Sequence, residues 1–163
     1  IYLAKRYPGT HILAFEPVHD SYQYLVRNTR VNGVWGIDLY NHAVTADGRG
    51  VHMFGAYAFN SGGMTTIGSD IATGTTASSM SIADVFNLYP DRTIDLLKID
   101  CEGAEYEILM RAAELLRRVR YLRGEFHDSE TLEAQGYTAK GLVEFCSRYI
   151  QLENIHVMCC RMG

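Results

Sequence analysis

The sequence predicts an α/β fold with a mostly parallel sheet, formed by a single domain of residues 1–163. Apolar runs of strand length alternate with segments whose apolar residues recur at helical spacing. The clearest pair is the run 94–99, which ends in Asp100, and the helical pattern that follows it over 103–118. No internal repeat or linker divides the chain, whose 163 residues suit one hydrophobic core.

The first part of the chain predicts a helix end, a buried strand and a second helix. A short apolar and basic pattern over 1–7 stops at a proline–glycine pair, which ends helices, and 11–15 is then a short apolar run. The next helix is expected to have Asp20 or Ser21 as its N-cap and to stop at Gly33.

The middle of the chain predicts two strands and a long polar loop. A strand over 37–44 is expected to be joined to a second one over 50–55 by an Asp-Gly pair typical of hairpin turns. The stretch 60–79 is rich in Gly, Ser and Thr, so we expect a loop there with a short strand near 64–67.

The last part of the chain predicts alternating helices and strands. Ser81, with Asp84 three residues later, resembles a capping box that begins a short helix. Beyond the run 94–99 and its helix, we expect a strand over 120–126, a long helix over 138–149 and a final strand over 152–160.

The composition excludes several classes of protein. The net charge of −4 argues against a nucleic-acid binder, which needs clustered Lys and Arg. No apolar run approaches the roughly 20 residues of a membrane-spanning helix. The four cysteines include no C-x-x-C pair, and no His lies at zinc-ligand spacing from them. We therefore expect reduced thiols in a cytoplasmic protein without a structural zinc site.

Polar residues gather where the predicted strands end. In open α/β sheets, ligands bind beyond the carboxyl ends of the strands. Glu16 at the first of these ends fits a ribose-binding carboxylate, although a solvated turn carboxylate is the simpler interpretation of that residue taken without context. The residues at the predicted strand ends are Glu16, the segment Asn41-His42-Ala43, Asp100 with Glu102, and Glu125 with His127.

Three carboxylates fall within a span of six residues around the turn that follows the run 94–99: Asp100, Glu102 and Glu105. Like charges this close raise at least one pKa, which prepares a general base or a cation site. For Glu105, we favour the alternative that it complements the helix N-terminus. For Asp100, at the tip of the strand, we favour a functional role.

The run 94–105 resembles the signature D-L-L-K-I-D-V-E-G-A-E of the FkbM family of S-adenosylmethionine-dependent methyltransferases, with Cys101 in place of the common Val. The stretch 14–17, Ala-Phe-Glu-Pro, resembles the second-strand motif of the same family. The resemblance implies a Rossmann-like class I methyltransferase sheet, mostly parallel, with helices on both faces. It also implies O-methylation of a sugar, glycolipid or natural-product acceptor.

The resemblance further implies a site for S-adenosylmethionine. Glu16, followed by Pro17, would bind the ribose hydroxyls, and His42 and Ala43 would lie beside the adenine. Asp100 would face the transferring methyl group and the acceptor.

A hydroxyl acceptor must lose a proton during methyl transfer, which calls for a general base. The candidate catalytic residues are Asp100, Glu102 and His127. His127 is the only His at a predicted strand end beside carboxylates, although a His satisfied by a neighbour is an equal alternative.

The family's first strand and Gly-rich loop precede a helix such as the one that ends at 1–7, and no G-x-G-x-G pattern occurs in this chain. We therefore expect both to be missing, and we expect the chain to bind S-adenosylmethionine weakly. A missing strand would also expose sheet surface and favour self-association.

Two other functions compete with methyl transfer. One is a non-catalytic domain of the same fold that serves as an interaction or scaffold module. The other is a nicotinamide-dependent oxidoreductase, which would use Glu16 for ribose but would gain nothing from the carboxylates around Asp100. In the leading hypothesis, the partner is a small-molecule or glycan acceptor, with no metal ion, nucleic acid or membrane span.

Overall fold

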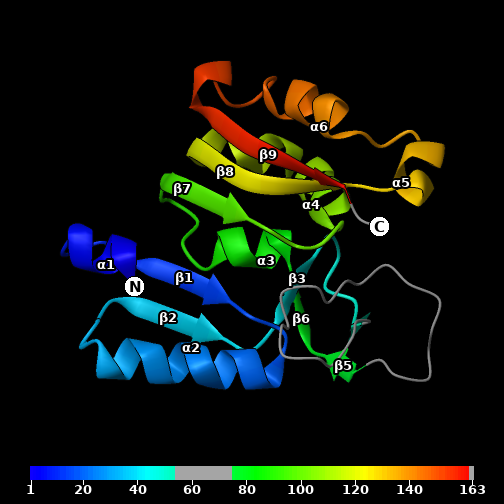
Figure 1. Ribbon diagram of the computed structural model, residues 1–163. Helices are drawn as coiled ribbons and strands as arrows, with labels where there is room; N and C mark the ends of the chain where they lie inside the picture. The colour runs from blue at the N-terminus through cyan, green and yellow to red at the C-terminus, as the bar shows by residue number, and fades with distance from the viewer. Residues whose placement is uncertain (54–74, 162–163) are drawn as a thin grey trace.

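Parallel strand pairing dominates the structure, a computed structural model that describes residues 1–53 and 75–161 (Figure 1). Three parallel strands form one sheet, and two more parallel pairs and one antiparallel pair accompany it. The strands are β1 Ile12–Phe15 with β2 Ile37–Tyr40, β3 Ala43–Thr45 with β6 Ser79–Ser81, β4 Val51–Met53 with antiparallel β5 Thr75–Ala77, and β7 Ile94–Ile99 with β8 Val119–Asp128 and β9 Ile155–Arg161.

Short helices connect these strands. The α-helices are α1 Tyr2–Arg6, α2 His19–Val31, α3 Ile82–Asn87, α4 Glu105–Ala112, α5 Glu130–Ala134 and α6 Ala139–Cys146, with 3-10 helices η2 Ala113–Arg118 and η3 Leu152–Asn154. The mixed α/β class with parallel strands is therefore confirmed, whereas the full Rossmann-like order and the missing first strand remain predictions. Among the described residues, no helix is long and apolar enough to cross a membrane.

The main hydrophobic core lies between the sheet β7–β8–β9 and the helices α3, α4 and α6. Side chains alternate along β8, so Leu122 and Phe126 are fully buried in this core while Tyr121 and Arg123 lie on the exposed face. The arrows of β1, β2, β7, β8 and β9 point toward the same side in Figure 1, so their carboxyl ends share one edge of the molecule. That edge is where an α/β sheet binds ligands.

Several sequence predictions are confirmed. The helix at 1–7, the strand at 11–15 and the strand at 94–99 are all present within a residue or two. The capping box is present as well, since Ser81 Oγ accepts the backbone N–H of Asp84 at 3.0 Å and begins α3.

The strand predicted over 37–44 forms as two strands, and β4 lies within the strand predicted over 50–55, but the hairpin predicted between them is wrong. The strand breaks at 41–42 into β2 and β3, because β2 pairs with β1 whereas β3 pairs with β6. A turn forms at Gly48, whose φ is 83°, but β4 then pairs with β5 instead of returning along β3. The predicted loop over 60–79 is wrong from residue 75 onward, where β5 and β6 form, and the strand near 64–67 lies outside the described residues.

Helix boundaries also differ from the predictions. Val18 occupies the N-cap of α2, so neither Asp20 nor Ser21 caps it, although Gly33 does follow its end with a φ of 58°. The helix expected over 103–118 ends as an α-helix at Ala112 and tightens into η2.

The C-terminal boundaries differ in the same way. The helix expected over 138–149 ends at Cys146, and the short helix α5 was not predicted. The strand β9 begins only at Ile155, and β8 extends to Asp128. The longer β8 places His127, which was expected just beyond the strand, inside it.

Candidate functional site

The turn between β7 and α4 is held by the carboxylate of Glu105. Its Oε1 accepts the backbone N–H of Cys101 at 2.6 Å, and its Oε2 accepts that of Gly103 at 3.0 Å. Glu102 and Gly103 both adopt left-handed backbone conformations, with φ of 52° and 103°, and Glu102 pays a steric cost that glycine avoids. Glu105 is 0% exposed, so it organises the turn from inside rather than complementing the helix end from the surface.

His127 on β8 reaches the same carboxylate. Its Nδ1 lies 3.1 Å from Glu105 Oε1, and its Nε2 lies 3.4 Å from Glu102 Oε2. Because Glu105 already accepts two backbone N–H groups as a carboxylate, we assign the ring proton to Nδ1. Nε2 then carries no proton and faces Glu102 as a hydrogen-bond acceptor. The contact between Nε2 and Glu102 Oε2 is favourable when one of these two atoms carries a proton.

The electrostatic setting of Glu102 follows from this arrangement. Burial raises the pKa of the Glu102 carboxyl, and the neighbouring carboxylates of Asp100 and Glu105 add to the effect while His127 opposes it. His127 itself is only 6% exposed. A carboxyl whose pKa moves toward neutrality is suited to proton transfer.

Asp100 completes this group at the tip of β7. Lys98 Nζ lies 2.9 Å from its Oδ2. One carboxylate oxygen from each of Asp100 and Glu102 and one ring nitrogen of His127 all lie within 4.8 Å of one another. The three residues predicted to be catalytic are therefore brought together, although they come from two strands and a turn.

The end of β8 is anchored by Asp128. Its Oδ1 accepts the hydroxyl proton of Tyr106 on α4 and the backbone N–H of Ala139 at the start of α6. Burial and this bond raise the pKa of Tyr106 well above its ordinary value. These bonds link the end of β8, next to His127, to the helices α4 and α6.

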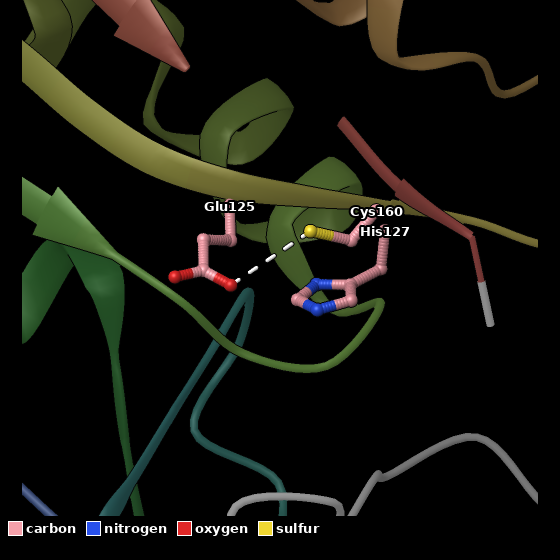
Figure 2. Close-up of side chains that lie close together, drawn as sticks. All are labelled: Glu125, His127 and Cys160. Carbon is pink, nitrogen blue, oxygen red and sulfur yellow. Dashed lines mark hydrogen bonds between the residues drawn. The ribbon is translucent and has the colours of Figure 1, made fainter. Parts of the chain in front are cut away.

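A second group shares His127 and was only partly anticipated from the sequence. Cys160 on β9 lies directly beside His127 in the parallel register, and Glu125 is two residues earlier on the same face of β8 (Figure 2). Cys160 Sγ lies 3.8 Å from Glu125 Oε2. The spacing of these residues along the sequence does not predict that they lie together, because the register between β8 and β9 places Cys160 beside His127.

The residues predicted to bind the cofactor lie at the ends of β1 and β2. Glu16 Oε1 accepts the backbone N–H of Val18 at 2.8 Å, and burial raises the pKa of its carboxyl. Asn41 joins the two strand ends by donating to the carbonyl oxygens of Glu16 and Pro17 at 2.8 and 3.2 Å. No pattern in the sequence predicted this bridging role of Asn41.

His42 and Ala43 differ in what they offer to a ligand. His42 Nδ1 is buried and has no hydrogen-bond partner within the described part of the chain. Ala43 is buried in β3, and its backbone N–H already donates to Ser78 O at 2.8 Å. His42 therefore offers an unsatisfied polar atom, whereas Ala43 offers only apolar contact.

A cavity of about 390 Å³ adjoins the turn after β7. Its lining includes Arg49, Gly103, Tyr106, Thr131 and Tyr137. This volume lies in the range of small-molecule pockets, and the mixed polar and aromatic walls suit a hydroxylated ligand.

Comparison with known proteins gives one match. A family model described as the methyltransferase FkbM domain matches residues 1–151 of the chain. No curated protein and no solved structure matches it.

Proposed function

Because the chain belongs to the FkbM methyltransferase domain family, we propose that it transfers a methyl group from S-adenosylmethionine to a hydroxyl of a small-molecule or glycan acceptor. The observation that carries the proposal is the contact of His127 with both Glu102 and the buried Glu105 at the carboxyl edge of the strands. A hydroxyl acceptor needs a base to take its proton, and the positively charged methyl donor cannot act as one. Residues held in these contacts can serve as that base.

The residues at the ends of β1 and β2 fit the cofactor. Glu16 uses only Oε1 in a hydrogen bond within the described part of the chain, which leaves Oε2 for a ribose hydroxyl. The unpartnered Nδ1 of His42 suits a polar edge of the adenine, because a buried polar atom without a partner is costly until a ligand satisfies it. When bound, S-adenosylmethionine supplies an electrophilic methyl group on a positively charged sulfur.

The acceptor's proton goes to Glu102 in this proposal. Burial keeps its pKa raised, and His127 Nε2 can take up the proton across the 3.4 Å contact. Asp100, next to Lys98, adds negative charge that favours a cationic donor nearby. Holding acceptor and donor in line accounts for much of the rate in such a displacement, so positioning matters as much as the base.

Cofactor binding is tested by titrating the isotopically labelled chain with S-adenosylmethionine up to millimolar concentration and following backbone amide signals. We expect shifts at Val18 and His42, and an affinity at least about tenfold lower for Glu16→Gln, because one charged hydrogen bond is lost. Asp20→Asn, at an exposed site in the first turn of α2, is the matched control. Unchanged binding by Glu16→Gln would exclude the ribose role.

Transfer is tested with hexoses, glycolipids and polyketide-type alcohols as acceptors, by measuring S-adenosylhomocysteine release and the added methyl mass. For an active acceptor, Glu102→Gln should lower kcat by about 10²–10⁴-fold without weakening cofactor binding. Asp95→Asn, at the exposed start of β7, should leave kcat unchanged. Cofactor binding without transfer to any of these acceptors would favour the non-catalytic alternative.

The proposal keeps three predictions from the sequence. They are the Rossmann-like strand order, a cytoplasmic location and self-association through exposed sheet surface. Each has a separate measurement, namely an experimental structure, fractionation of cells and sedimentation of the purified chain.

A further inference from the structure

We propose that Glu125, His127 and Cys160 bind a divalent transition-metal ion, with zinc as the ion that their donor atoms fit best. The three side chains project from the same face at the carboxyl ends of β8 and β9 (Figure 2). Linear spacing along the chain argues against a zinc site, but alternation within β8 and the register between β8 and β9 bring the three side chains together. The ion would occupy His127 Nε2 in place of the proton that this nitrogen takes up in the proposed methyl transfer, so the two roles exclude each other while the ion is bound.

The distances are close to those of a metal site. One ligand atom from each residue lies within 4.8 Å of the other two, and Cys160 Sγ lies 3.8 Å from Glu125 Oε2. Tetrahedral zinc with ordinary bond lengths separates its ligand atoms by about 3.3–3.6 Å. Side-chain rotations that close the remaining ångström would complete the site without moving the strands.

The donor set discriminates between metals. Imidazole nitrogen, thiolate sulfur and carboxylate oxygen are all zinc ligands, whereas magnesium and calcium take oxygen donors. Three protein ligands would leave a fourth position on the ion for water.

Glu105 supports the site from behind His127. Metal-bound His residues usually donate their other ring N–H to a carboxylate, which fixes the ring and raises its basicity. Glu105 holds Nδ1 at 3.1 Å and is itself fixed by two backbone N–H groups, so Nε2 is the nitrogen left for a ligand. This rigid support is present before any ion binds.

Cys160 must lose a proton for the ion to bind. A thiol binds a metal ion as the thiolate. On binding, the Sγ–H bond breaks, an Sγ–metal bond forms and the proton leaves to solvent.

An oxygen-rich set competes for the same His127. Asp100, Glu102 and His127 also lie within 4.8 Å of one another. We favour the set with Cys160, because Asp100 would have to exchange its ion pair with Lys98, whose Nζ lies 2.9 Å from Oδ2, for a bond to the metal ion. The two sets differ in whether sulfur is a ligand, which spectroscopy detects directly.

The test is a titration of the chelator-treated, reduced chain with Co²⁺, followed by displacement with Zn²⁺. We expect a near-ultraviolet thiolate-to-cobalt band in the wild type and in Cys159→Ser, which alters the neighbouring exposed thiol. Cys160→Ser should lose the band and bind Zn²⁺ at least about 100-fold more weakly, and Glu125→Gln should bind it at least about tenfold more weakly. Thermal melts recorded by circular dichroism should confirm that each variant folds.

Three results would overturn the proposal. The first is a wild-type chain that shows no thiolate band at saturating Co²⁺. The second is a band that persists in Cys160→Ser. The third is zinc binding that Asp100→Asn abolishes and Cys160→Ser leaves intact, which would assign the ion to the oxygen-rich set. Because the readout is metal binding, none of these results depends on whether the chain transfers methyl groups.

Discussion

The strand group β7–β8–β9 and the strand pair β1–β2 offer a contrast in packing. The first group contributes Leu122 and Phe126, both fully buried, to a core closed by α3, α4 and α6. Every residue of β1 and β2 is only half-buried, and Thr29 is the one buried residue of α2. The β7–β8–β9 half therefore holds most of the apolar burial that stabilises the described chain.

The helix ends follow the same division. The helices α3, α5 and α6 begin at Ser81, Ser129 and Thr138, and each of these side chains accepts a backbone N–H. Neither α1 nor α2 has a side-chain cap, and α4 in the well-packed half also begins without one. Side-chain caps therefore occur only in the well-packed half, although not on each of its helices.

The proposed chemistry divides accordingly. Glu102, Glu105 and His127 lie on the well-packed half, where groups that move a proton must be held precisely. Glu16 and His42, proposed to bind the cofactor, lie on the looser half, where a ligand adds stability that the chain lacks. The contrast between the halves can be tested by four substitutions, from the largest expected effect to the smallest.

Removing core volume should separate the two halves most clearly. Leu122→Ala on β8 should lower the free energy of unfolding by about 2–5 kcal/mol, because a fully buried side chain leaves a cavity. Leu39→Ala on half-buried β2 should cost less than about 2 kcal/mol. Urea denaturation of both variants measures the difference, and equal losses would contradict the contrast.

Glu105→Gln tests the buried anchor of the turn after β7. The variant should lose about 2–3 kcal/mol of stability, because the amide replaces a carboxylate that accepts two backbone N–H groups and the His127 proton. Glu107→Gln removes only an exposed pairing with Arg49 and should cost less than about 1 kcal/mol. Similar losses in both variants would show that Glu105 acts only as a helix-end charge.

Ser81→Ala tests the side-chain cap of α3. The loss of the bond from the Asp84 backbone N–H should cost about 1 kcal/mol. Ser147→Ala, at an exposed position after α6, should change stability by no more than about 0.5 kcal/mol. Thermal or urea unfolding distinguishes these values. An unchanged free energy of unfolding in Ser81→Ala would show that side-chain capping does not contribute to the difference between the two halves.

Glu16→Gln tests the looser half through pH. Burial raises the pKa of Glu16 above its unfolded value of 4.5, so folding favours the protonated carboxyl. That contribution is complete below the unfolded pKa and is lost as pH rises through the folded pKa. Gln mimics the protonated form, so the variant should match the wild type near pH 4 and exceed it slightly, by less than about 1 kcal/mol, near pH 7. If the stability of the variant relative to the wild type were lower at pH 7 than at pH 4, the pKa of Glu16 would be lowered on folding instead of raised.

Much of the fold could be predicted because its signals are local. The apolar run 94–99 needs only its own side chains to indicate a buried strand, and the Ser81–Asp84 capping box lies within one helical turn. The hairpin after Thr45 was wrong because an Asp-Gly turn sets a local bend but not the partner of the strand beyond it. The carboxyl boundary of β8 was missed because pairing with β9 extends the strand to Asp128.

The candidate site divides in the same way. Asp100, Glu102 and His127 were found from the residues that end strands, and the structure places them together. Glu105 was assigned to the helix end, because its full burial depends on how α4 packs against β8. Cys160 carried no sequence signal, because only the register of β8 against β9 sets it beside His127.

The sequence by itself determined the α/β class, the family and the residues at the carboxyl ends of the strands, because periodicity, capping and the motif around Asp100 are short-range properties. The tertiary structure decided which strands pair, which half is well packed and which groups share His127. Those outcomes depend on contacts between residues far apart in the chain. Their free energy comes from burial and register, which no single segment contains.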